Sequence, residues 1–166
     1  RYKHLQSCYD ENLIYSDTFV VNYFQRMLKV ILDANPQLPK DFRLEVSRNP
    51  WPNAACYGEG TIMYHLELIR WMENESQLAY VLCHEIGHQY ANHVNNDIDT
   101  YVAAVNDPEY QKKLKSIYNS QYNTFSQALD LFKSFAYDDS KHSRLHESDA
   151  DSLAIVLMRN TPYSEL

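Results

Sequence analysis

The chain has 166 residues, of which 45% are hydrophobic and 22% are charged, values typical of a globular protein with one core. A net charge of −7 without a lysine or arginine cluster argues against a nucleic-acid-binding protein. Only three glycines stand beside fourteen tyrosines, so we expect a helix-rich fold with amphipathic surfaces. No apolar run approaches the ~18 residues that cross a bilayer, and no transmembrane span is predicted.

The first half of the chain predicts one helix followed by short strands. Apolar residues with helical spacing run from Asp17 to Asp33, and the prolines of NPQLP (35–39) end this helix. Residues 42–48 alternate apolar and polar side chains, as a strand does. After a turn, residues 54–66 predict two short strands, and a short helix is expected over 66–72.

The second half predicts mostly helix. Asn74 or Ser76 is a suitable cap for a helix that we expect to run to about Asn95. Residues 147–160 form an apolar stretch, which predicts a buried helix carrying several carboxylates. The polar stretch between these two helices predicts a helical insertion at about 97–140, with weak helical patches at 99–105, 109–118 and 124–136.

Three cysteines are widely spaced along the chain: Cys8, Cys56 and Cys83. Their odd number and the absence of a CxxC pair do not fit a disulfide framework. We predict free thiols, with one bridge as the alternative, and we place Cys83 in the core.

VLCHEIGHQYANH (81–93) places two histidines four residues apart and a glutamate after the first. On a helix His84 and His88 share one face, one turn apart, while Glu85 lies at its flank. There Glu85 could act on a metal-bound water without binding the metal itself. An ordinary surface helix with two exposed histidines is the alternative. The histidine face lies roughly opposite an apolar stripe of Leu78, Leu82, Ile86 and Tyr90.

A catalytic zinc site needs a third protein ligand. The extended pattern HExxHxxGxxH fails, because Ala91 and Val94 occupy its last two fixed positions. His93 is one residue out of place and falls on the apolar stripe, so we interpret it as a structural histidine.

Glu147 is the favoured third ligand among the glutamates that follow the histidines. Glu109 lies in the polar stretch and Glu165 in the C-terminal tail, whereas Glu147 begins the apolar helix. Asp151 follows one turn later on the same face. Buried carboxylates need a partner, which zinc would give Glu147 and a histidine N–H would give Asp151. An acidic first turn favoured by the helix dipole accounts for Glu147 but poorly for Asp151.

HEIGH together with ESDAD resembles the gluzincins, and more narrowly the metallopeptidase family of the HtpX-like, BepA-like and CAAX prenyl proteases. The similarity covers about Asn53 to Met158. It implies an α+β fold, a mainly helical zincin-like domain with a small mixed or antiparallel sheet whose edge strand borders the active-site cleft. Residues 1–166 are then a single catalytic domain with the insertion at about 97–140.

The resemblance assigns roles to individual residues. His84, His88 and Glu147 match the ligands of one Zn²⁺ per chain, and Glu85 matches the general base. Asp151 and His93 match residues that support the ligands. Two positions depart from the family: Glu67 stands where glycine is usual, and Ser152 stands where arginine commonly follows the aspartate. No residue is assigned to stabilise the transition state, since that group normally lies beyond this helix.

We therefore predict a zinc-dependent endopeptidase in which Glu85 activates a zinc-bound water. The substrate is a peptide or misfolded protein, bound along the predicted edge strand formed by Thr61, Ile62, Met63, Tyr64 and His65. The alternative is a zinc-binding chaperone-like or regulatory module with little protease activity. The resemblance favours the bacterial cell envelope, periplasmic or lipid-anchored, and allows membrane-associated partners.

Overall fold

The computed structural model describes residues 2–57, 59–120 and 122–165, except for the side chains of residues 2, 4, 5, 132, 134–142, 164 and 165. The chain divides into two compact units. The first comprises residues 1–94 and 149–166, and the second comprises residues 95–148.

Two helices begin the first unit. Helix α1 (Tyr2–Asp10) was not predicted, because its short sequence is mostly polar and has Leu5 as its one aliphatic residue. Helix α2 (Thr18–Ala34) confirms the predicted helix, and the Asp17 carboxylate caps it by accepting the N–H groups of Phe19 and Val20. The buried residues of α2 recur at helical spacing: Phe24, Met27, Leu28, Ile31 and Leu32.

A small mixed sheet follows, built from β1 (Arg43–Ser47), β2 (Ala54–Cys56) and β3 (Thr61–His65). The order is β1-β3-β2, with β3 parallel to β1 and antiparallel to β2. The predicted class, mainly helical α+β with a small mixed sheet, is confirmed. The prediction that residues 61–65 form an edge strand is wrong. Their apolar run has no alternation, which suits a central strand covered on both faces.

Helices α3 (Leu66–Ile69) and α4 (Glu75–Tyr90) come next, and α4 carries HEIGH. The side chain of Asn74 caps α4 by accepting the N–H of Gln77 at 3.0 Å. The helix ends at Tyr90, earlier than the predicted Asn95. The backbone of Asn92 has φ 57°, a left-handed conformation that asparagine tolerates and that interrupts a helix.

Three further helices follow: α5 (His93–Asn106), α6 (Pro108–Tyr118) and the long α7 (Thr124–Met158). Pro108 begins α6, as its missing N–H allows at a first helical turn, and Asp107 caps it. The predicted patch at 124–136 lies within α7, and the predicted helix at 147–160 forms its last part, which ends at Met158. A short 3₁₀ turn, η1 (Pro162–Glu165), follows. None of the helices in the described ranges combines the length and apolar character that a bilayer crossing requires.

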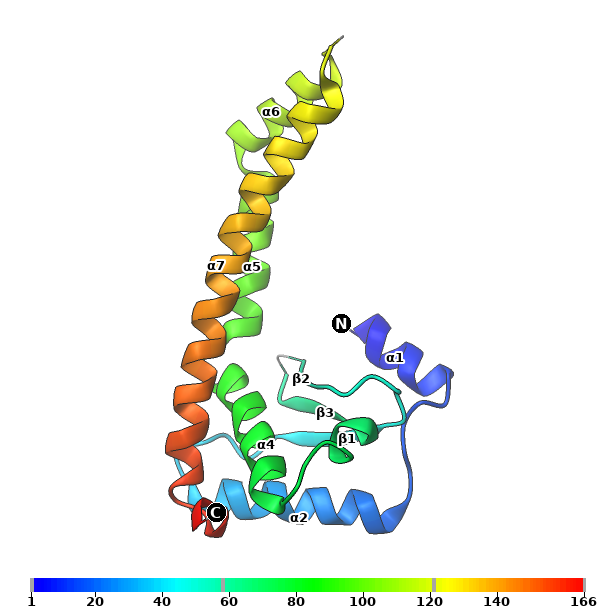
Figure 1. Ribbon diagram of the computed structural model, residues 1–166, viewed down its shortest axis with the longest axis vertical. Helices are drawn as coiled ribbons and strands as arrows, with labels where there is room; N and C mark the ends of the chain where they lie inside the picture. Colours follow the sequence, from blue (N-terminus) through cyan, green and yellow to red (C-terminus); the bar gives the residue numbers. More distant parts are fainter. Residues whose placement is uncertain (1, 58, 121, 166) are drawn as a thin grey trace. The chain divides into compact units, whose positions relative to one another are not determined.

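The core of the first unit lies among α2, the sheet, α4 and the last turns of α7. Figure 1 shows α2 and α4 beside the three strands. The buried side chain of Asn35 ties the end of α2 to the end of α7. Its amide donates to the carbonyls of Ile31 (2.9 Å) and Leu157 (3.1 Å) and accepts from Asn160 (2.8 Å).

Candidate metal centre

His84 and His88 project from α4 on the face away from its buried leucines. Leu78 and Leu82 are buried in the core, whereas both histidines are half-buried. The Nε2 atoms of the two imidazoles lie 3.1 Å apart. The predicted opposition of the two faces is therefore present, although Tyr90, at the end of the apolar stripe, is half exposed.

The other nitrogen of His84 is held by Asp151. The distance from Nδ1 of His84 to Oδ1 of Asp151 is 2.9 Å, and Tyr80 donates its hydroxyl to the same oxygen, also at 2.9 Å. A carboxylate only accepts hydrogen bonds, so the proton of His84 is assigned to Nδ1. This assignment leaves a lone pair on Nε2.

The other nitrogen of His88 is held by His93, which is 4% exposed. Their Nδ1 atoms are 3.2 Å apart, and Nε2 of His93 lies 3.9 Å from a carboxylate oxygen of Asp149. If His93 directs Nε2–H toward Asp149, its Nδ1 accepts the proton of His88 Nδ1–H. His88 then also carries its lone pair on Nε2.

With these two proton assignments the Nε2 lone pairs of His84 and His88 face each other at 3.1 Å, an arrangement that a cation between them would stabilise. Two nitrogens bound tetrahedrally to zinc at about 2.0–2.1 Å would be about 3.3 Å apart. Among the described residues, His84, His88 and Glu147 form a group whose potential ligand atoms all lie within 4.8 Å of one another. This donor set, two imidazoles and a carboxylate, fits a zinc ion with one coordination position left for another molecule.

The carboxylates of α7 are less buried than the sequence suggested. Glu147 is exposed, and the side chain of Asp151 is 55% exposed. The face of α7 that packs against the core is instead formed by Ala150, Ala154 and Leu157. The free-energy cost of burying Glu147 and Asp151, on which the prediction of their roles partly depended, is therefore smaller than expected. Asp151 is instead distinguished by its two hydrogen bonds.

Glu85 lies on the inner side of α4, where it is buried. Its negative charge acts on Tyr64 of β3. Burial, and after it the charge of Glu85, raises the pKa of the Tyr64 hydroxyl above its usual value. Glu85 therefore faces the sheet side of α4, beside the histidines but apart from the three grouped ligand atoms.

The proposed substrate strand, residues 61–65, does not offer a free edge. Residues 61–64 are buried, and β1 and β2 pair on its two sides. His65 donates Nδ1–H to the carbonyl of Trp51 at 2.8 Å. The outer strand on the side of α4 is β2, whose Cys56 thiol lies 3.5 Å from the amide oxygen of Gln89.

Gly87, inside HEIGH, allows α4 and α7 to approach closely. A Cβ added there would lie 3.2 Å from the carbonyl oxygen of Ala150 and 3.3 Å from both Cα of Ala150 and Cβ of Leu153. This role could not be predicted from the sequence, because the pattern HExxH allows any residue at position 87. Because Gly87 lets the backbone of α7 at Ala150 lie close to α4, the next residue, Asp151, can reach His84.

Comparison with known families gives a match over most of the chain. The pattern of Peptidase family M48 matches residues 21–165. The Mitochondrial metalloendopeptidase OMA1 of Schizosaccharomyces pombe is 27% identical over 157 residues, 95% of this chain and 44% of that protein. The Beta-barrel assembly-enhancing protease of Escherichia coli is 30% identical over 80 residues, 48% of this chain and 16% of that protein. The chain thus spans less than half the length of either relative.

Proposed function

Because the chain belongs to peptidase family M48, as HEIGH and ESDAD led us to expect, we propose that it acts as a zinc-dependent endopeptidase. The observation that carries this proposal is the pair of Nε2 atoms 3.1 Å apart, each on a ring whose Nδ1 already has a partner. A carboxylate completes the group.

In this proposal His84, His88 and Glu147 hold the zinc ion, and Asp151 and His93 orient the two imidazoles. When bound, zinc supplies Lewis acidity that polarises the scissile carbonyl and lowers the pKa of water toward ~7. Glu85 accepts a proton from the attacking water and donates it to the leaving amine. Its position on α4 directly beside His84 supports this role.

The substrate is proposed to be a peptide or misfolded protein in extended form. Since β3 is central, its residues cannot form a new strand pair, and we assign the peptide to the outer edge of β2 instead. The contact between β2 and the last turn of α4 supports this choice, because it places that edge beside the helix that carries the histidines.

We further propose that residues 97–140 are an insertion in one catalytic domain, which the compact unit at 95–148 supports. The names of the relatives refer to mitochondria and to β-barrel assembly. They support a membrane- or envelope-associated setting, and the bacterial envelope is the finer proposal. A zinc-binding module with chaperone-like or regulatory function and little protease activity is the second candidate, supported by the large polar insertion.

The test measures zinc content and turnover of unfolded casein for the wild type and for Glu85→Gln. We expect one zinc ion in each protein and cleavage by the wild type alone. Equal inactivity of both proteins with zinc retained would favour the module without protease activity. Failure of the wild type to bind zinc would refute the metal centre itself.

A further inference from the structure

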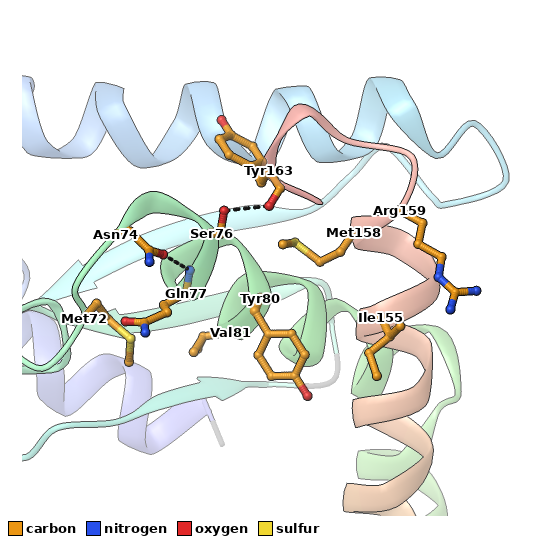
Figure 2. Close-up of a pocket in the computed structure, with 10 residues that line it drawn as sticks. All are labelled: Met72, Asn74, Ser76, Gln77, Tyr80, Val81, Ile155, Met158, Arg159 and Tyr163. Carbon is orange, nitrogen blue, oxygen red and sulfur yellow. Dashed lines mark hydrogen bonds between the residues drawn. The ribbon is translucent and has the colours of Figure 1, made fainter. Parts of the chain in front are cut away.

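Tyr80 lies on α4 one turn before His84, outside the HExxH pattern. Its hydroxyl donates to Oδ1 of Asp151, the same atom that receives Nδ1–H of His84, and both distances are 2.9 Å. Three side chains from two helices therefore meet at one oxygen atom. Figure 2 shows Tyr80 projecting from α4 toward α7, with the hydroxyl at the far end of the ring.

The exposure of Asp151 makes this second hydrogen bond important. With 55% of its side chain exposed, the carboxylate has few packing contacts that would fix its rotamer, and water competes for its oxygens. The phenol of Tyr80 is itself anchored, because its half-buried ring packs against the core. The ring also borders an apolar groove of about 600 Å³ together with Val81, Ile155 and Met158. A fixed donor thus holds Oδ1 in the position that accepts from His84.

We propose that Tyr80 is a positioning residue of the metal centre, which holds Asp151 so that His84 keeps its proton on Nδ1 and directs Nε2 to the zinc ion. The inference rests on the proposed function, because it assigns a role toward the same metal. Burial, and next the hydrogen bond to Asp151, raise the pKa of Tyr80 to about 12. The hydroxyl therefore remains a donor throughout the working pH range.

Tyr80→Phe tests the proposal, because it removes the hydroxyl and keeps the ring in the groove. Direct partners of zinc-bound histidines change metal affinity by about 10- to 100-fold, so a group one step further out should contribute about 3- to 10-fold. The zinc dissociation constant is measured by competition with a chromophoric chelator. The melting temperature of the zinc-free protein is measured beside it to separate metal binding from folding.

Tyr23→Phe is the matched control. Tyr23 also donates its hydroxyl to a carboxylate on α4, Oε1 of Glu75 at 2.7 Å, but this pair has no link to a histidine. Its loss should leave the zinc dissociation constant unchanged. A double-mutant cycle with Asp151→Ala completes the design, since Tyr80→Phe should have no further effect on zinc affinity once Asp151 is absent.

A 3- to 10-fold weaker zinc affinity for Tyr80→Phe, lost in the Asp151→Ala background, supports the inference. An unchanged affinity, an equal loss in Tyr23→Phe, or the same effect without Asp151 overturns it. These outcomes leave the proposed function standing as long as the wild type binds zinc. Absence of zinc binding by the wild type overturns both.

Discussion

Gly87→Ala probes the close approach of α4 and α7 that brings Asp151 to His84. The added methyl group would meet the backbone of Ala150 at 3.2–3.3 Å and Cβ of Leu153 at 3.3 Å, where ordinary contacts begin near 3.4 Å. Two of these three contacts are with backbone atoms. No change of rotamer relieves them, and α7 must move away by a few tenths of an ångström.

Two opposing contributions set the effect on stability. Alanine is favoured over glycine inside a helix by about 1 kcal/mol. Overpacking of a tight contact costs about 1–3 kcal/mol. We therefore expect a net loss of about 1 kcal/mol in the free energy of unfolding, which lowers the melting temperature by about 2–4 °C in a chain of this size.

Zinc affinity is the more sensitive measurement. A displaced α7 lengthens the 2.9 Å hydrogen bond between His84 and Asp151, so we expect zinc binding to weaken about 10-fold. Both quantities are measured on the same preparation, by thermal unfolding without metal and by chelator competition. A variant that is more stable than the wild type, with unchanged zinc affinity, would show that the approach of the two helices is not limiting.

Three further predictions concern the metal, a buried thiol and a buried amide. Zinc at 100 times its dissociation constant should raise the free energy of unfolding of the metal-free protein by about 2.7 kcal/mol, measured as a higher melting temperature, and His88→Ala should abolish this increase. Burial raises the pKa of Cys83 to about 12, so the folded state keeps a proton that the unfolded chain loses above pH 9. The free energy of unfolding should then fall by about 1.4 kcal/mol between pH 8 and pH 10 through this thiol, and a urea titration showing the same fall in Cys83→Ala would contradict the assignment. Asn35→Leu should cost about 2–4 kcal/mol in urea unfolding, because it leaves the carbonyl of Leu157 and the amide of Asn160 without their partner, whereas Asn160→Ala should cost about 1 kcal/mol.

Local signals predicted the elements that depend on local chemistry. The cap at Asp17 and the spacing of apolar residues located α2, and Asn74 located the start of α4. The end of α4 was missed because it depends on the left-handed backbone of Asn92. Asparagine permits this conformation but also occurs inside helices, so its presence alone did not fix the end of the helix. The central position of β3 was missed because strand order follows from pairing between distant segments.

The candidate site also has one part that could be predicted from local sequence and another that could not. The histidine pair on α4 follows from helical geometry alone, so the sequence was sufficient to place it. The contacts that support it join residues far apart in the chain, 71 positions for Tyr80 with Asp151 and 67 for His84 with Asp151. No periodicity encodes such contacts. The roles of Tyr80 and Gly87 were therefore not predicted, although each residue lies within one turn of His84.

Because α4 and the last part of α7 are far apart in the sequence, the ribosome synthesises them at different times. Glu147 follows Tyr90 by 57 residues. At the usual rate of translation, roughly 3 to 11 s pass between the appearance of the two segments. During this interval the nascent chain has both histidines and Glu85 but lacks Glu147 and Asp151. The zinc site proposed above can therefore form only after the last part of α7 has been synthesised.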